Sequence, residues 1–162
     1  MSGHLTEVRT RLACPVDAEI LHALVLELAA HEDSLDDVRV TVDGWKRLLS
    51  RDDVRVVIAS DGPGAVGYAS TVRRLSLWLG GDVLAMDDLY VREAARNRGV
   101  GQVLMAAVAG LAAPDRLPVV WSASLTNVDG HRFYQRLGAD LKTRVAASWS
   151  PDDYLFTVSD TL

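Results

Sequence analysis

The amino-acid sequence predicts an α/β (α+β) domain with a mixed, mostly antiparallel sheet. Short β-branched segments separated by glycine and proline turns precede Val91, which favours consecutive antiparallel strands. The order then becomes strand, helix, strand, and this crossover predicts a parallel pair in the middle of the sheet. With 162 residues, 49% of them hydrophobic, and no linker or repeat, we expect residues 1–162 to form one domain. We expect about seven strands flanked by about four helices.

The N-terminal third contains one predicted strand and two predicted helices. Val8 to Leu12 alternates apolar and charged residues, as a half-buried strand does. Beyond Asp17 the apolar residues recur at helical spacing, and Pro15 is a start signal, so the first helix runs to about Ala30. A second, shorter helix follows Thr41, which is a suitable N-cap.

The middle of the chain predicts three sequential strands. Val54 to Ser60 is β-branched and stops at Asp61-Gly62-Pro63-Gly64, a sequence typical of a tight turn. The return strand begins near Ala65, and Gly80-Gly81 turns the chain into a further strand that ends at Val91. We therefore expect these strands to pair with antiparallel neighbours.

The C-terminal half predicts two helices and three strands. A helix over residues 100–113 is ended by Pro114, and a strand over residues 118–125 follows. Gly138 is typical of the residue that follows a helix, which closes the second helix. Weaker patterns predict two final strands, over residues 142–149 and 154–158.

Composition excludes several classes of function. A formal net charge of -5 disfavours general nucleic-acid binding, and the longest apolar stretch is far shorter than the roughly 20 residues of a membrane span. The charged N-terminus does not resemble a secretory signal, and the single Cys14 suits a reducing compartment, so we expect a cytoplasmic protein. The four histidines show no metal-ligand spacing, and we expect no metal.

The loop "RNRGVG", Arg96 to Gly101, predicts an anion site. Gly99 and Gly101 allow a ligand to approach the main chain, and the following helix directs free N–H groups at the loop. Arg96 and Arg98 add charged donors that suit phosphate oxygens. Phosphate or pyrophosphate is the expected occupant.

Three alternatives compete for this loop. A P-loop requires Gly-Lys followed by Ser or Thr, whereas Gly101 is followed by Gln102 and Val103. A dinucleotide fingerprint requires a third glycine and the first strand of a βαβ unit, and neither is present. A plain strand-to-helix turn explains the two glycines but does not explain Arg96 and Arg98.

The motif Arg96-x-x-Gly99-x-Gly101 resembles the acetyl-CoA pyrophosphate motif of the GCN5-related N-acetyltransferase (GNAT) superfamily. Residues 121–141, "WSASLTNVDGHRFYQRLGADL", resemble the second half of that fold, in which Asn opens a helix. Within the superfamily, "DDLYV", "ELAAHE" and "FYQRLGADL" are most similar to the diamine (spermidine/spermine) and thialysine acetyltransferases. The resemblance covers nearly the whole chain and is strongest over Asp87 to Ala139.

The resemblance implies that acetyl-CoA is the co-substrate and lies in a splay between the fourth and fifth strands. Backbone groups of Leu89, Tyr90 and Val91 are expected to hold the pantetheine arm and the thioester carbonyl. Asn127, which is also a good N-cap, and Tyr134 are expected to contact coenzyme A. The pyrophosphate is expected on Arg96, Asn97, Arg98, Gly99, Val100, Gly101 and Gln102.

Two residues are expected to be catalytic. Tyr134 is the candidate acid that protonates the coenzyme A sulfur. Phe133 and Leu137 should face the core, so the adjacent Tyr134 should point to a different side of the helix. The alternative is that Tyr134 is a packing residue. Asp87 matches the position of a Glu that faces the acceptor amine, where a carboxylate binds an ammonium and accepts its proton. Asp88 should point to the opposite face of a regular strand and is expected to be structural.

The acidic run "HEDSLDD", residues 31–37, follows the first helix. A charge run of this kind is ordinarily a solvated loop. The alternative is a collar that attracts a cationic acceptor, in which Glu32 matches an acceptor-site Glu of the diamine subgroup.

Together these features predict an N-acetyltransferase that moves acetyl from acetyl-CoA to a primary amine of a small cationic acceptor, with a polyamine or diamino acid favoured. The alternatives are a non-catalytic acyl-CoA-binding module, or an acetyltransferase of aminoglycosides or protein amines. The resemblance implies a homodimer, and we expect neither nucleic acid nor membrane as a partner.

Overall fold

The computed structural model describes residues 7–159 and divides the chain into two compact units, Met1–Ser122 and Ala123–Leu162. The first unit contains the sheet and three helices, and the second contains two helices. Residues 1–6, on which the predicted absence of a secretory signal partly rests, lie outside the described part. Within residues 7–159, no helix combines the length and apolar character needed to cross a membrane.

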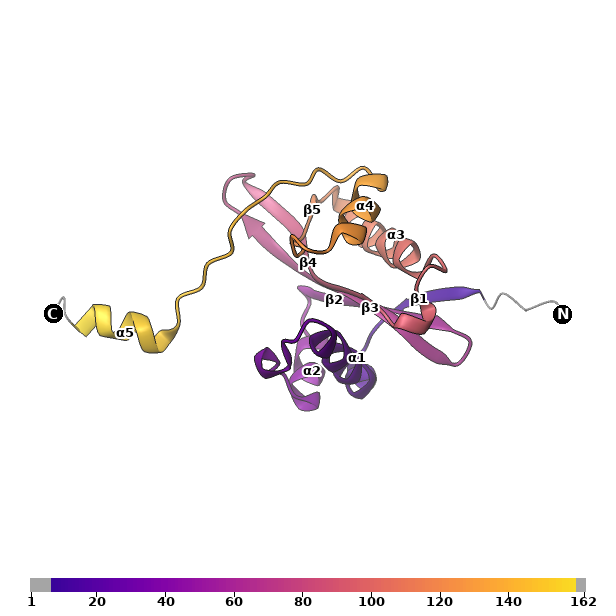
Figure 1. The fold of residues 1–162 in the computed structure, drawn as a ribbon, viewed down its shortest axis with the longest axis horizontal. Coiled ribbons are helices and arrows are strands. Elements are labelled where there is room, and N and C mark those ends of the chain that lie inside the picture. The colour runs from indigo at the N-terminus through magenta and orange to yellow at the C-terminus, as the bar shows by residue number, and fades with distance from the viewer. Residues whose placement is uncertain (1–6, 160–162) are drawn as a thin grey trace. The chain divides into compact units, whose positions relative to one another are not determined.

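The first unit is built on a five-stranded sheet whose strands lie side by side in chain order. The first four strands are antiparallel to their neighbours, and β5 is parallel to β4 (Figure 1). The predicted meander and parallel pair are therefore confirmed, but the pair lies at the edge of the sheet rather than in its middle, because no further strand follows β5 in the order. The strands are β1 (Val8–Leu12), β2 (Val54–Asp61), β3 (Gly64–Ser76), β4 (Gly81–Val91) and β5 (Val119–Val120).

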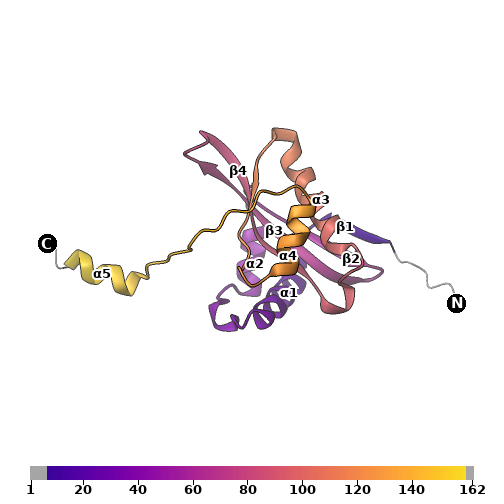
Figure 2. The same cartoon turned by 45° about the horizontal axis from the view of Figure 1, so that its top comes forward.

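Three helices cover the two faces of this sheet. Helices α1 (Ala18–His31) and α2 (Val42–Leu49) lie on one face, and α3 (Val100–Ala112) lies on the other (Figures 1 and 2). Thr41 caps α2 as predicted, because its Oγ1 accepts a hydrogen bond from the Gly44 N–H at 3.0 Å. Since both faces of the sheet are covered, residues 56–59 of β2 and 67–71 of β3 are buried.

The core on the α1 side joins the two helices to the middle strands. Leu21 and Leu24 of α1 are fully buried, as is Tyr68 of β3, and Trp45 of α2 packs into the same cluster. Burying each aliphatic side chain contributes roughly 1.5–3 kcal/mol. This cluster packs α1 and α2 against β2, β3 and Tyr90 of β4.

The second unit contains α4 (Val128–Arg136) and α5 (Pro151–Ser159). Asn127 caps α4 through a hydrogen bond that its Oδ1 accepts from the Gly130 N–H at 3.0 Å. Gly138, with a φ of 87°, follows the helix as predicted.

The prediction of two final strands, over residues 142–149 and 154–158, is wrong. Residues 139–150 form neither helix nor strand, and α5 covers residues 154–158. Local start signals explain the helix: Pro151 opens it, Asp152 and Asp153 lie in its first turn, and the Asp153 N–H donates to Ser150 Oγ at 3.2 Å. The sheet consequently has five strands rather than about seven, and the fold class is unchanged.

Candidate functional site

The glycine loop adopts the geometry that its sequence demands. Gly99 has a φ of 79° and is the N-cap of α3, a left-handed conformation that favours glycine. Val103 N–H donates to Gly99 O at 3.1 Å and closes the first turn, so the N–H groups of residues 100–102 have no acceptor within the helix. No acidic residue lies in that turn. The loop therefore presents an N-terminal helix end that suits an anion.

Both arginines of the loop make protein contacts that brace it. Arg96 Nε donates to Val91 O at 3.0 Å, which ties the loop to the end of β4. Arg98 Nη2 donates to Asp61 Oδ2 at 2.7 Å, which ties it to the β2–β3 turn. The second Asp61 oxygen, Oδ1, is buried without a hydrogen-bond partner among the described residues.

Strands β4 and β5 pair over a very short length. The ladder consists of Leu84 opposite Val119 and Ala85 opposite Val120. The predicted strand over residues 118–125 is thus reduced to Val119–Val120. From Met86 to Val91, β4 has no ladder partner on the β5 side, so the backbone of Leu89, Tyr90 and Val91 lies along an open edge. The splay expected between the two strands, with acetyl-CoA in it, stays a prediction.

A β-bulge places the two aspartates of β4. Ser70 lies opposite Asp88 and Thr71 opposite Met86, so Asp87 is the extra residue. The expectation that Asp87 and Asp88 point to opposite faces assumed an uninterrupted alternation, and the bulge interrupts that alternation at Asp87.

Asp88 is held by two hydroxyl groups of β3. Its Oδ2 accepts hydrogen bonds from Tyr68 Oη at 3.1 Å and from Ser70 Oγ at 3.3 Å, and its N–H donates to Ser70 Oγ at 3.1 Å. Burial, and then the negative charge of Asp87, raises the pKa of Asp88 against the opposing effect of the two hydroxyls. Burial, followed by the charge of Asp88, also raises the pKa of Tyr68, which therefore stays a hydrogen-bond donor.

The end of α1 adds further acidic groups to this face. Glu32 is the exposed C-cap residue of α1, and its charge contributes to the raised pKa of Tyr68, so it lies near that side chain. Arg92 binds both oxygens of Glu27 at 2.9 and 2.7 Å and donates to Ala65 O at 2.8 Å. The guanidinium of Arg92 lowers the pKa of Glu27. The Arg92–Glu27 ion pair holds α1 against the end of β4.

The remaining predicted residues, Asn127 and Tyr134, belong to the second unit. Tyr134 is buried with 8% exposure, and its ring centroid lies 5.4 Å from that of Phe133. Leu137 is 41% exposed, so the expectation that Leu137 faces the core is wrong. Burial raises the pKa of Tyr134, which keeps its phenol protonated at neutral pH.

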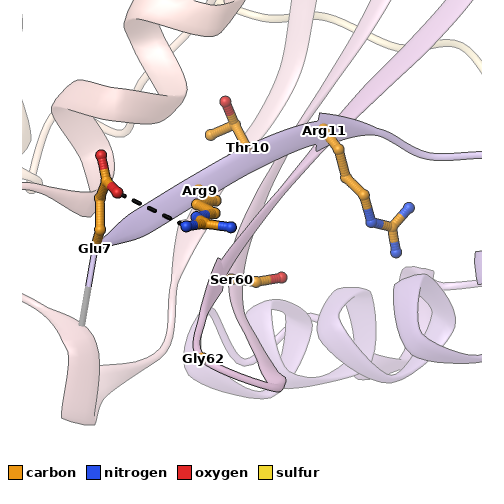
Figure 3. Close-up of a pocket in the computed structure, with 6 residues that line it drawn as sticks. All are labelled: Glu7, Arg9, Thr10, Arg11, Ser60 and Gly62. Carbon is orange, nitrogen blue, oxygen red and sulfur yellow. Dashed lines mark ion pairs between the residues drawn. The ribbon is translucent and has the colours of Figure 1, made fainter.

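A separate cavity lies along β1 at the opposite edge of the sheet from β5 (Figure 3). It has a volume of about 490 Å³, and its arginines are already paired: Arg11 with Asp17 at 2.7 Å and Arg9 with Glu7 at 3.9 Å. None of the predicted site residues lines it. The lining residues are Glu7, Arg9, Thr10, Arg11, Ser60 and Gly62.

Sequence reasoning missed Tyr68 and Ser70. Both lie in the otherwise apolar buried run of β3, and a hydroxyl in such a run signals a buried hydrogen-bond partner. Within residues 7–159, the structure contains no group of three or more His, Cys, Asp or Glu residues arranged to hold a metal ion.

Comparisons with known proteins agree with this architecture. The structure resembles the aminoglycoside acetyltransferase meta-AAC0020 from an uncultured soil metagenomic sample, in complex with sisomicin, with a TM-score of 0.75 and 14% identity over 88% of this chain and 95% of that one. It also resembles the aminoglycoside N-acetyltransferase AAC(6')-Iy in complex with CoA, with a TM-score of 0.73 and 20% identity over 90% and 95% of the two chains.

A third similar structure is the ribosomal-protein-alanine N-acetyltransferase from Brucella melitensis biovar Abortus 2308, with a TM-score of 0.64 and 20% identity over 88% of this chain and 100% of that one. At these identities the likeness establishes the fold. Residues 19–139 match the sequence profile of the Acetyltransferase (GNAT) family, which covers most of the chain. The chain therefore belongs to the GNAT family and is an acetyl-CoA-dependent N-acetyltransferase.

Proposed function

We propose that this enzyme transfers acetyl from acetyl-CoA directly to a primary amine of a small polycationic acceptor. The observation that carries the proposal is the group of carboxylates around the bulge of β4. Asp87 and Asp88 lie at the bulge, and the charge of Glu32, at the end of α1, acts on Tyr68, which donates a hydrogen bond to Asp88. An ammonium group is attracted to such a site before any contact forms.

Acetyl-CoA is proposed to bind along the open edge of β4 and at the start of α3. The N–H groups of residues 100–102 and the side chains of Arg96 and Arg98 suit the pyrophosphate. Backbone groups of residues 89–91 are proposed to hold the pantetheine arm and polarise the thioester carbonyl, as an oxyanion donor does. Asn127 and Tyr134 complete the proposed coenzyme A contacts.

The proposed chemistry is direct attack of a neutral amine on the thioester carbonyl. The new C–N bond forms a tetrahedral oxyanion, and its collapse breaks the C–S bond and releases a thiolate. Tyr134 donates its proton to that thiolate, and its raised pKa supports this role because the phenol remains protonated at neutral pH. Asp87 is proposed to bind the incoming ammonium and to accept a proton from it, directly or through water.

The class of acceptor follows from charge. Polyamines, diamino acids and aminoglycosides all carry several ammonium groups, and the acidic face suits each of them. Solved relatives with this fold are named as aminoglycoside acetyltransferases, and two of them contain sisomicin or an acetylneamine bisubstrate analogue. We therefore propose aminoglycosides as the second acceptor class to be tested beside the polyamines and diamino acids.

The experiment is acetyl-CoA-dependent thiol release measured with polyamines, diamino acids, aminoglycosides and basic peptides, against an acceptor-free control. Turnover with one class of amine identifies the acceptor. Acetyl-CoA binding by calorimetry without turnover on any amine would instead favour the acyl-CoA-binding module.

The assembly and location of the enzyme remain predictions. We propose that residues 1–162 act as one acetyltransferase domain in a cytoplasmic homodimer. Sedimentation equilibrium of the purified protein distinguishes a dimer from a monomer across a range of concentrations.

A further inference from the structure

Glu27 and Arg92 form an ion pair at the end of the strand that is proposed to hold acetyl-CoA. Arg92 directly follows β4, and its Nε and Nη2 donate to the two carboxylate oxygens of Glu27, in the second half of α1, at 2.9 and 2.7 Å. Its Nη1 donates to the Ala65 carbonyl oxygen of β3 at 2.8 Å, and its main-chain N–H donates to the Val66 carbonyl oxygen at 2.8 Å. One residue therefore joins α1, β3 and the end of β4.

Tyr90 of β4 belongs to the same group of contacts. Its phenol donates to Glu27 Oε2 at 3.3 Å, and its ring centroid lies 6.3 Å from that of Tyr68 in β3. The side chain of Tyr90 is buried in the core between α1 and the sheet. Because these contacts occupy the side chain, Tyr90 offers its main-chain groups to a ligand at the open edge of β4.

The opposite face of the sheet restricts the same main chain. Gly67 of β3 lies opposite Val91, and a Cβ at Gly67 would collide with the Tyr90 carbonyl oxygen. The same Cβ would also contact Leu104 of α3, so this close approach lies on the α3 face. The end of β4 is thus held on one face by the ion pair to α1 and on the other by its close approach to β3.

We propose that Glu27 and Arg92 are positioning residues for acetyl-CoA, because their ion pair holds the main chain of residues 90–91 in the conformation that meets the pantetheine arm. The proposal rests on the acetyl-CoA position proposed above, along the edge of β4 beyond its short ladder with β5. An edge without a neighbouring strand takes its conformation from the contacts on its other sides. Here those contacts come from β3 and α1.

The charges of this group suit a permanent anchor. Hydrogen bonds from Arg92, opposed by burial, lower the pKa of Glu27, so its carboxylate is ionised at neutral pH. Burial, and then the charge of Glu27, raises the pKa of Tyr90, so its phenol stays a hydrogen-bond donor. The group therefore keeps one protonation state near neutral pH, as a positioning role requires.

The place of the pair at the end of β4 predicts a selective effect on coenzyme binding. The pyrophosphate is proposed to bind residues 96–102, and the pantetheine arm is proposed to bind residues 89–91. Loosening the end of β4 weakens the contact with the arm, whereas the loop keeps its own anchor in the ion pair of Arg98 and Asp61. Phosphoadenosine diphosphate, the nucleotide part of coenzyme A, carries the pyrophosphate and lacks the arm. Its affinity therefore separates the two contacts.

The test is calorimetric titration of the Glu27→Gln variant with acetyl-CoA and with phosphoadenosine diphosphate. Loss of the charged pair is expected to weaken acetyl-CoA binding about fivefold and to leave the affinity of the nucleotide part unchanged. Asp82→Asn is the matched control, because Asp82 forms a similarly exposed ion pair with Arg73 at the other end of β4. The control is expected to bind both ligands as the wild type does. In the Glu27 variant, equal weakening of both ligands, or unchanged binding of both, would overturn the proposal.

A double-mutant cycle tests whether Glu27 and Arg92 act as one unit. Glu27→Gln, Arg92→Gln and the double variant are expected to weaken acetyl-CoA binding by the same factor, since each breaks the same pair. Effects that multiply in the double variant would show two independent roles and contradict the proposal. A wild-type enzyme that binds acetyl-CoA no more tightly than its nucleotide part would instead refute the proposed pantetheine site, on which this inference rests.

Discussion

Arg98 and Asp61 form an ion pair with an Nη2 to Oδ2 distance of 2.7 Å, across 37 residues of sequence. The Asp61 side chain is only 14% exposed, so the pair is partly shielded from solvent. It joins the loop at the start of α3 to the turn between β2 and β3. The position of the proposed pyrophosphate loop therefore depends on a hairpin that precedes it in the chain.

Asp61→Asn is expected to raise the KM for acetyl-CoA about fivefold with little change in kcat, because a charged hydrogen bond contributes about 1 kcal/mol to holding the loop. Steady-state kinetics at saturating acceptor measure this effect. Asp53→Asn is the matched control, since Asp53 forms a more exposed ion pair of the same length with Arg51. An equal rise in KM in both variants would contradict the prediction.

Gly99→Ala is expected to weaken acetyl-CoA binding and to destabilise the fold by roughly 1–2 kcal/mol, because an L-residue is strained at its φ of 79°. Gly110→Ala lies within α3, where a Cβ meets nothing within 4 Å, and is expected to stabilise the fold by up to about 1 kcal/mol. Urea unfolding and calorimetric titration with acetyl-CoA give both quantities. Changes of the same sign in the two variants would refute the backbone argument.

Tyr134→Phe is expected to lower kcat at least about tenfold, because the thiolate loses its proposed acid, while the dissociation constant of acetyl-CoA changes little. Single-turnover thiol release and calorimetry separate the two effects. Unchanged turnover would remove Tyr134 from catalysis and leave it as a packing residue.

Arg11 and Asp17 are expected to make stability depend on pH. The hydrogen bonds from Arg11 lower the pKa of Asp17 from 3.8 to about 2, so the stabilisation of about 2 kcal/mol is present above pH 3.8 and is lost as the pH falls through about 2. Arg11→Gln should thus lower the free energy of unfolding at pH 7 by more than at pH 2.5. Urea unfolding at both pH values measures the difference, and an equal loss at both would contradict the linkage.

Several features were predictable because they depend on neighbours in sequence. The caps of Thr41 and Asn127, the left-handed Gly99 and the order of strands up to β5 all follow from local propensities and apolar periodicity. The membership of the GNAT family was likewise predicted, from the motif of residues 96–101 and the resemblance of residues 121–141. The closer likeness to diamine acetyltransferases has no support from the comparisons, in which the similar structures include aminoglycoside acetyltransferases.

The sequence by itself determined the residue types of the loop over residues 96–101 and the order of helices and strands up to β5. Backbone conformation and the spacing of apolar residues are local properties of the chain. Only the tertiary structure decided that Asp87 is a bulge residue and that Asp88 shares a face with Tyr68 and Ser70. The physical reason is register: the partner of each β4 residue is set by its pairing with β3, which places Asp88 opposite Ser70, and a single extra residue shifts the register beyond it.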